Sequence, residues 1–143
     1  MLKVLLPVDG SEASNRAVDH MIKNAEFYKE PIELHLLNVQ YPIPYGSRVA
    51  SFIGHDKIND YLKEEGMNAL KPAMGKLDAA GIAYHYHIGV GEPAETIADY
   101  ARQKQCDRIY MGTRGMGSVS NVLLGSVATK VIALADVPVL LVK

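Results

Sequence analysis

Three glycines and a serine near the C-terminal end of the chain have a spacing that suits phosphate binding. They are Gly112, Gly115, Gly125 and Ser126, in the pattern G-x2-G-x9-G-S, between an apolar, strand-like run and a helix-like run. Glycine lets the backbone approach an anion closely and adopt positive φ. The N-terminus of a helix adds unpaired N–H donors and the positive end of the helix dipole. The pattern therefore predicts a phosphate-binding loop.

Two common nucleotide-binding motifs do not account for these glycines. A P-loop has the form G-x4-G-K-[ST], but Gly117 is followed by Ser118 and Val119, so the phosphate-binding lysine is missing. A dinucleotide fingerprint has the form G-x-G-x-x-G, but Gly115 and Gly117 are followed by Ser120 where the third glycine belongs. The competing interpretation of the segment is a flexible connection with helix caps.

The elements that must position this loop alternate along the whole chain. Strand-like runs are Leu2–Val8, Pro31–Val39, Ile82–Val90, Arg108–Gly112 and Val137–Val142, and helix-like runs are Ala13–Tyr28, Asp56–Ala80, Ala94–Gln105 and Ser126–Ala135. This alternation predicts an α/β fold, with an open parallel sheet and helices on both faces. Because proline removes a helical hydrogen bond, Pro72 predicts a kink in the second helix or a break at Lys71.

Three strand ends are expected to converge on one crevice. Ligands of open parallel sheets bind outside the carboxyl ends of the strands, where the strand order reverses. If the first strand is central, its end at Pro7–Gly10 meets the second strand's end at Asn38–Gln40 and the fourth strand's end at Met111–Gly112. A carboxylate for ribose, apolar walls for a base and amides for phosphates would then face one ligand. Asp9 is also a common turn or capping residue, which is the alternative for this position.

Size, charge and cysteine content exclude several classes of protein. A chain of 143 residues predicts a single domain, spanning 1–143. With 15 basic and 16 acidic residues it has no basic excess for nucleic acid. No apolar run approaches the ~20 residues of a membrane span. The single cysteine, Cys106, excludes a disulfide framework and fits a reducing cytosol, so we expect a cytoplasmic protein in which Cys106 is a packed residue.

Two histidines are a candidate metal pair. His85 and His87 are two positions apart in a predicted strand, so both side chains could face one side. No third ligand is identifiable from the sequence, so ordinary strand polarity or a dimer contact is the favoured interpretation and the metal is left unknown.

The segment Tyr41–Gly54 is rich in proline and glycine and predicts a long loop. Loops of that length in compact domains are often functional. Tyr41 and Tyr45 could cover the crevice, while loop packing or partner contact explains them equally well.

Several segments together resemble one known family. They are VDGSEAS near the N-terminus, GEPAETI in the middle, and MGTRG, LLGSVATKVI and VPVLLV towards the C-terminus. They resemble the universal stress protein family over essentially the whole chain. The pattern G-x2-G-x9-G-[ST] is the mark of that family's ATP-binding branch, and here every position matches.

The resemblance implies a fold and an assembly. The expected sheet has five parallel strands in the order 3-2-1-4-5, as in Rossmann-like folds of the adenine nucleotide alpha hydrolase type. It also implies a homodimer paired through the last strand, Val137–Val142. Independently of the resemblance, so short and apolar a strand at a sheet edge would be an exposed pairing template unless a second copy covered it.

The resemblance also implies a role for each site residue, with ATP and Mg²⁺ as the ligands. Asp9 would hold the ribose and lie near the metal-bound phosphates. The adenine would be framed by Pro7, Val8 and Val39, the last through its backbone. The phosphate side would consist of Met111, Gly112, Gly115, Gly125, Ser126 and Val127. Arg114 would either neutralise phosphate or point to solvent.

The expected activity is regulation by ATP in the stress response, with hydrolysis absent or slow. The site lacks the P-loop lysine and any evident residue that positions a water for phosphoryl transfer. One alternative is a nucleotide-independent dimeric interaction module, against which the intact glycine pattern argues. The other is a binder of AMP or cyclic AMP, because loop spacing does not set the number of phosphates.

Overall fold

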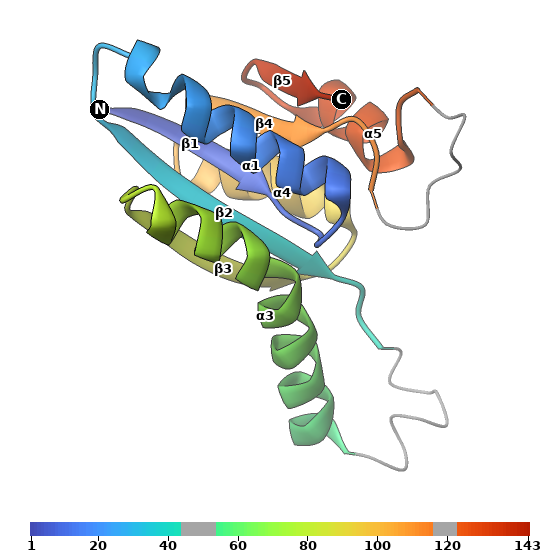
Figure 1. Cartoon of the computed structure of the whole chain (residues 1–143). Coiled ribbons are helices and arrows are strands. Elements are labelled where there is room, and N and C mark those ends of the chain that lie inside the picture. The colour runs from blue at the N-terminus through green and yellow to red at the C-terminus, as the bar shows by residue number, and fades with distance from the viewer. Residues whose placement is uncertain (44–53, 116–122) are drawn as a thin grey trace.

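Five parallel strands form the sheet on which the rest of the molecule is built (Figure 1). The computed structural model describes residues 1–43, 54–115 and 123–143. The strands are β1 (Leu2–Pro7), β2 (Ile32–Gln40), β3 (Tyr84–Val90), β4 (Arg108–Gly112) and β5 (Val139–Val142). Their order across the sheet is β3-β2-β1-β4-β5, which confirms the predicted α/β class and the order 3-2-1-4-5.

Helices cover both faces of the sheet. They are α1 (Glu12–Asn24), α3 (His55–Ala79), α4 (Pro93–Gln103) and α5 (Ser126–Leu134), with a short 3-10 turn, η1 (Ala25–Phe27), after α1. Side chains of α1 and α3 pack on one face, and those of α4 and α5 pack on the other. In the part of the chain that the structure describes, no helix is long and apolar enough to cross a membrane.

The central strand, β1, is buried on both faces. Val4 and Leu6 pack with residues of α1 and α3, while Leu5 between them packs with residues of α4 and α5. All three side chains are fully buried. This two-sided burial explains the near-continuous apolar run at the start of the sequence, because only an interior parallel strand can bury consecutive side chains in this way.

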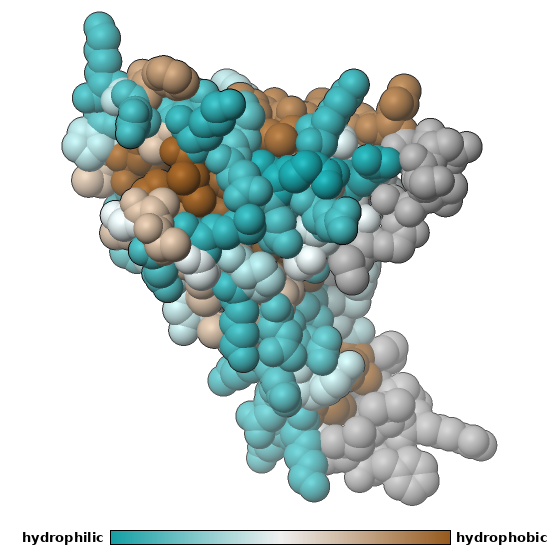
Figure 2. Space-filling view, viewed as in Figure 1, coloured by the Kyte–Doolittle hydropathy of each residue, from teal (hydrophilic) through white to brown (hydrophobic). Residues whose placement is uncertain are grey.

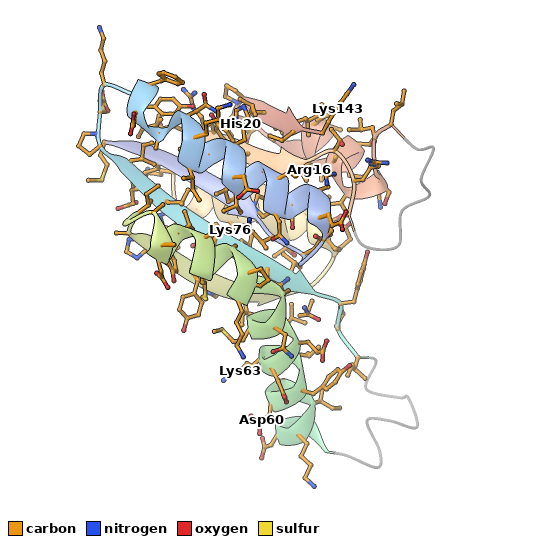
Figure 3. The ribbon with its side chains drawn as sticks, in the orientation of Figure 1. Arg16, His20, Asp60, Lys63, Lys76 and Lys143 are labelled. Carbon is orange, nitrogen blue, oxygen red and sulfur yellow. The ribbon has the colours of Figure 1, made fainter. Side chains whose placement is uncertain are left out.

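Helix α3 has 25 residues, and its N-terminal half projects away from the sheet (Figure 1). Figure 2 shows this half as hydrophilic, and its labelled side chains Asp60 and Lys63 are exposed (Figure 3). The helix runs through Pro72 without interruption, so the predicted break at Lys71 is wrong. Figure 1 shows that the helix bends along its length, in agreement with the predicted kink.

The other half of α3 is tied to α1. The Lys76 Nζ donates to Asp19 Oδ1 at 2.8 Å, and the two side chains lie at the surface (Figure 3). Beneath this ion pair, the apolar side chains Leu70 and Leu77 are fully buried against the sheet. Burial of these leucines, rather than the exposed ion pair, fixes α3 on the sheet, since exposed pairs contribute little.

Helix α1 ends earlier than the sequence predicts. Its last residue is Asn24, and η1 occupies most of the segment up to Tyr28 that was expected to be α-helical. The Asn24 side-chain amide donates to the His20 carbonyl at 2.8 Å. Asparagine side chains that bond to nearby backbone compete with the helix in this way, which accounts for the early end.

Strands β3 and β5 each begin two residues later than predicted because the preceding residues have other hydrogen-bonding roles. Gly81 has φ +70°, and the Ile82 N–H donates to the Leu77 carbonyl at 3.0 Å. Ile82 therefore completes the C-terminal cap of α3 instead of starting β3. In the last strand, Pro138 has no N–H to donate to the ladder, and β5 starts at Val139.

Gly112, at the end of β4, lies directly against Ala13 in the first turn of α1. A Cβ at this position would lie 2.6 Å from the Ala13 carbonyl carbon and 2.9 Å from the Ala13 Cβ. Backbone atoms cannot yield to such a contact as a flexible side chain can. Glycine here is therefore required for packing of α1 against β4, whether or not a ligand is present.

We expect Gly112→Ala to lower the free energy of unfolding by about 1–3 kcal/mol, because the added methyl overpacks the α1–β4 contact. The matched control is Gly75→Ala, at an exposed position of α3 where a Cβ would meet nothing within 4 Å. That change should stabilise the protein by roughly 0.5–1 kcal/mol through helix propensity. Urea denaturation of both variants measures the difference, and equal stability of the two would contradict the packing role of Gly112.

Candidate functional site

A cavity of about 380 Å³ lies at the carboxyl ends of β1, β2 and β4. All eleven residues that the sequence nominated for the site line it: Pro7, Val8, Asp9, Val39, Met111, Gly112, Arg114, Gly115, Gly125, Ser126 and Val127. They come from segments far apart in the sequence. The cavity sits where β1 has β2 on one side and β4 on the other, which is the point where the strand order reverses.

Asp9 is positioned by the start of α1. Its Oδ1 accepts a hydrogen bond from the Ser11 N–H at 2.9 Å, and Gly10 between them has φ +84°. Ser11 in turn caps the helix, because its Oγ accepts from the Ser14 N–H at 3.2 Å. Asp9 is therefore a turn residue and a wall of the cavity at the same time, and the two interpretations of this position do not compete.

Gly115 lies directly against the Asp9 carboxylate. A Cβ on Gly115 would be only 2.5 Å from Asp9 Oδ2. The absence of a side chain at this position lets the loop after β4 come up to the turn after β1. The first and second halves of the site are joined here, and a branched side chain would push them apart.

Gly125 joins the loop to helix α5. Its N–H donates to the Thr113 carbonyl, and a Cβ would lie 3.3 Å from both Thr113 O and Arg114 Cα. Gly125 is also the N-cap of α5, whose first residues, Ser126 and Val127, line the cavity. The first amides of a helix have no acceptor within the helix, so this arrangement directs N–H donors toward the cavity.

The residue that caps α4, Glu92, also contacts the middle of α5. Glu92 caps α4 by accepting from the Glu95 N–H at 2.7 Å, and the Lys130 Nζ of α5 lies 3.7 Å from its other carboxylate oxygen. The backbone hydrogen bond from Glu95, with a smaller contribution from Lys130, lowers the pKa of Glu92. The carboxylate is therefore ionised at neutral pH, and Pro93, the first residue of α4, forms part of the wall.

Another part of the cavity wall is apolar and buried. Val8 and Met111 are almost completely buried, as are Leu37 and Ile97, which the sequence did not nominate. Such a surface suits a planar, weakly polar ring. Leu37 lies inside a run of apolar strand residues, so nothing in the local pattern distinguishes it from core.

Asn38 is the most informative residue that sequence reasoning missed. It is 2% exposed, and its Nδ2 donates to the Val8 carbonyl at 2.8 Å. Its Oδ1 accepts from Gln40 Nε2 at 2.7 Å. This side chain fixes the end of β2 to the end of β1 beside the cavity. The available signal was a polar amide at the carboxyl end of a buried strand, where an unsatisfied group would be costly.

Six further residues line the cavity but were not predicted as site residues: Ser14, Gln40, Tyr41, Pro93, Thr113 and Ala128. Of these, only Tyr41 was considered from the sequence, as a cover for the crevice. Tyr45 and most of the loop Tyr41–Gly54 lie outside the described residues, as do residues 116–122 between Gly115 and Gly125.

Cys106 has the packing role that the sequence predicts. It is 4% exposed, among residues of α4 and β4, and is not part of the cavity wall. Burial raises the pKa of its thiol to about 11. A buried thiol that is protonated at neutral pH is a poor nucleophile, in agreement with a packing role.

The cavity lies where the strand order reverses, and Gly125 leads into the start of α5 at its edge. This arrangement is that of a Rossmann-like fold of the nucleotide-binding class. The model of the universal stress protein family matches residues 1–143. Universal stress protein MJ0531 of Methanocaldococcus jannaschii is 37% identical over 142 residues, covering 99% of this chain and 81% of that protein. This chain belongs to the universal stress protein family.

Solved structures with a similar fold support the assignment to this family. The structure of MJ0577, also from Methanocaldococcus jannaschii, matches with a TM-score of 0.80 and 30% identity over 99% of this chain and 95% of that one. A universal stress protein solved in complex with cAMP matches with a TM-score of 0.69 and 28% identity, covering 99% and 97% of the two chains. The family therefore includes a member that binds an adenine nucleotide.

We expect Asn38→Asp to destabilise the protein by about 1–3 kcal/mol. The substitution keeps the size of the side chain but replaces the donor to the Val8 carbonyl with a buried acceptor. Asn59→Asp, on the exposed part of α3, is the control for the same chemical change and should stay within about 0.5 kcal/mol of the parent. Chemical denaturation of both variants is the measurement, and a neutral Asn38→Asp would show that this bond does not fix the strand ends.

Proposed function

We propose that this protein is an ATP-binding regulatory protein of the stress response that acts as a homodimer. The observation that carries the proposal is the meeting of all eleven nominated residues around one cavity. ATP would be held by Asp9, Val39 and the phosphate loop from Gly112 to Ser126.

Each part of the cavity matches one part of the nucleotide. The apolar wall with Val8 and Met111 suits adenine, and the backbone of Val39 at the end of β2 provides polar atoms for its edge. The Asp9 carboxylate suits the ribose hydroxyls and lies beside Gly115, where Mg²⁺ bound to phosphate would be attracted to it. The start of α5 at Ser126 supplies amides and a hydroxyl for phosphate oxygens.

The lining of the cavity supports a site that binds rather than turns over its ligand. Phosphoryl transfer requires a group that positions the attacking nucleophile. Among the described residues of the wall, Gln40 is the side chain closest to that role in type, and its amide already donates to Asn38 Oδ1 at 2.7 Å. We therefore propose that hydrolysis is absent or slow, and that occupancy of the site is the signal.

A second candidate ligand is cyclic AMP. The 28% identical relative solved with cAMP supports it, because adenosine could occupy the same wall with a single phosphate near the loop. The glycine pattern and the start of α5 favour a longer phosphate chain. Competition among ATP, ADP, AMP and cAMP for the purified protein separates these ligands, and ATP is expected to bind most tightly.

We expect Mg-ATP to stabilise the parent protein by about 2.7 kcal/mol at a concentration of one hundred times its Kd. Gly115→Val should abolish this gain, because the branched side chain collides with the Asp9 carboxylate. Gly75→Val, which adds the same side chain at an exposed helix position, should keep nucleotide binding. Calorimetric titration with Mg-ATP gives the affinities, and a phosphate-release assay on the same samples gives the turnover.

Three outcomes would contradict this proposal. Wild-type affinity in Gly115→Val would remove the phosphate loop from the site. No binding of any adenine nucleotide by the parent protein would leave the nucleotide-independent interaction module as the function. Rapid phosphate release by the parent, lost in Gly115→Val, would instead replace the regulatory proposal with an ATPase.

The proposed dimer would pair through β5. This strand is at the edge of the sheet, and its side chains are only half-buried. The Pro138 carbonyl accepts from the Ile109 N–H of β4, and the Val142 carbonyl accepts from the N–H of Thr113, the residue after β4. Because successive residues of a strand direct these groups to opposite sides, the N–H and C=O of Leu141 point away from β4. An edge of this kind is a template for a second strand.

We expect Leu141→Pro to convert the dimer to a monomer, because it removes the outward N–H while leaving the bonds to β4 in place. Leu141→Ala is the control, since it removes the same side chain from the core and keeps the N–H. It should remain dimeric with reduced stability. Sedimentation equilibrium of the two variants and the parent decides the question, and a dimeric Leu141→Pro would place the interface elsewhere.

A further inference from the structure

A second cluster of chemistry-bearing side chains lies on the sheet away from the cavity. Glu33 and His35 of β2, His85 of β3 and Tyr100 of α4 meet on the face covered by α4. None of them lines the nucleotide cavity. The parallel register pairs His35 with His85, and their rings lie 5.0 Å apart between centroids.

The two residues from β2 are already arranged as neighbouring ligands. The His35 Nε2 lies 3.0 Å from Glu33 Oε2. Two ligand atoms bound at about 2.0–2.1 Å to one tetrahedral ion lie roughly 3.3 Å apart. One ligand atom from each of Glu33, His35 and His85 can be chosen so that all three lie within 4.8 Å of one another. Only His85 must move closer, and its side chain is exposed on the edge strand β3.

We propose that Glu33, His35 and His85 form a binding site for one divalent transition-metal ion, with zinc as the representative ion. Two imidazoles and one carboxylate are a ligand set that suits zinc and neighbouring transition metals. Magnesium and calcium prefer oxygen ligands, so the site is distinct in kind from a magnesium site at ATP phosphates. Three ligands leave a fourth position open to water.

Tyr100 is a positioning residue for this site. Its hydroxyl lies 3.0 Å from His35 Nδ1, and His35 is 7% exposed. Metal-bound histidines usually donate their other N–H to an oxygen acceptor, which fixes the ring. When the metal binds Nε2 of neutral His35, the ring proton resides on Nδ1 and is donated to the Tyr100 oxygen. A tyrosine hydroxyl can accept as well as donate, so no buried group loses its partner.

The charge on Glu33 is suited to a cation. Lys3 Nζ lies 3.9 Å from Glu33 Oε2 and also donates to the Lys104 carbonyl at 3.4 Å. If a metal ion displaced Lys3 from Glu33, the Lys3 ammonium would therefore keep the Lys104 carbonyl as a partner.

From the sequence, His85 and His87 were a candidate metal pair, but ordinary strand polarity or a dimer contact was the favoured interpretation. The structure instead brings His85 to Glu33 and His35, while the ring of His87 stacks on Tyr100 at 5.6 Å between centroids. Two of the three proposed ligands, Glu33 and His35, come from the neighbouring strand β2. An ion at this place would cross-link β2 to the edge strand β3.

The test is calorimetric titration of zinc into the tag-free, nucleotide-free full chain, with thermal unfolding in parallel. We expect one ion per chain and a rise in Tm. His85→Ala and Glu33→Gln should each weaken zinc binding by at least about tenfold. His20→Ala is the control, because His20 is an imidazole of α1 on the opposite face (Figure 3), and it should bind zinc as the parent does.

Two further variants separate a built site from casual binding to histidines. Tyr100→Phe keeps the ring and removes only the hydroxyl, and we expect roughly tenfold weaker zinc binding with nucleotide affinity unchanged. Lys3→Gln removes the competing cation and should strengthen zinc binding. The proposal is overturned if the parent binds no zinc, or if His85→Ala binds it as tightly as the parent. Neither result bears on ATP binding, which is measured separately.

Discussion

The burial of β1 on both faces is the constraint from which the rest of the structure follows. Val4, Leu5 and Leu6 are fully buried in succession, which is possible only for a strand with neighbours on both sides and helices on both faces. Once β1 is central, right-handed crossovers send β2 to one side and β4 to the other. The chain leaves the end of β1 toward α1 on one face and the end of β4 toward α5 on the other, and the cavity lies between these two strand ends.

The glycines of the phosphate loop have different physical roles, although one motif contains them all. Gly112 accommodates the backbone of Ala13, Gly115 accommodates the Asp9 carboxylate, and Gly125 accommodates the backbone of Thr113 and Arg114. Each allows a close approach between elements that form the cavity. The pattern in the sequence therefore specifies the shape of the loop, and the chemistry for adenine and ribose comes from the ends of β1 and β2.

Element types could be predicted from apolar periodicity, and the sheet order from the family resemblance. The rule for strand ends in parallel sheets also placed the nominated residues around one cavity. The boundaries of α1, β3 and β5 could not be predicted from apolar periodicity. They depend on the side-chain hydrogen bond of Asn24, the backbone hydrogen bond of Ile82 and the missing N–H of Pro138. Asn38 was missed because its partner, the Val8 carbonyl, is 30 positions away in the sequence. Contacts between strands depend on register, and register emerges only when the sheet is assembled.

Register also explains how one sheet can carry two sites with unrelated chemistry. Ligands at the carboxyl ends of strands are held by loops and helix starts, which the order of the strands brings together. Side chains along the strands are brought together by lateral pairing instead, as His35 is with His85. Alternation along β2 places Glu33 and His35 on the α4 face and leaves Leu34 and Leu36 for the core beneath α1 and α3. The edge of the sheet at β3 can therefore acquire ligands for a metal without altering the central strand or the cavity that depends on it.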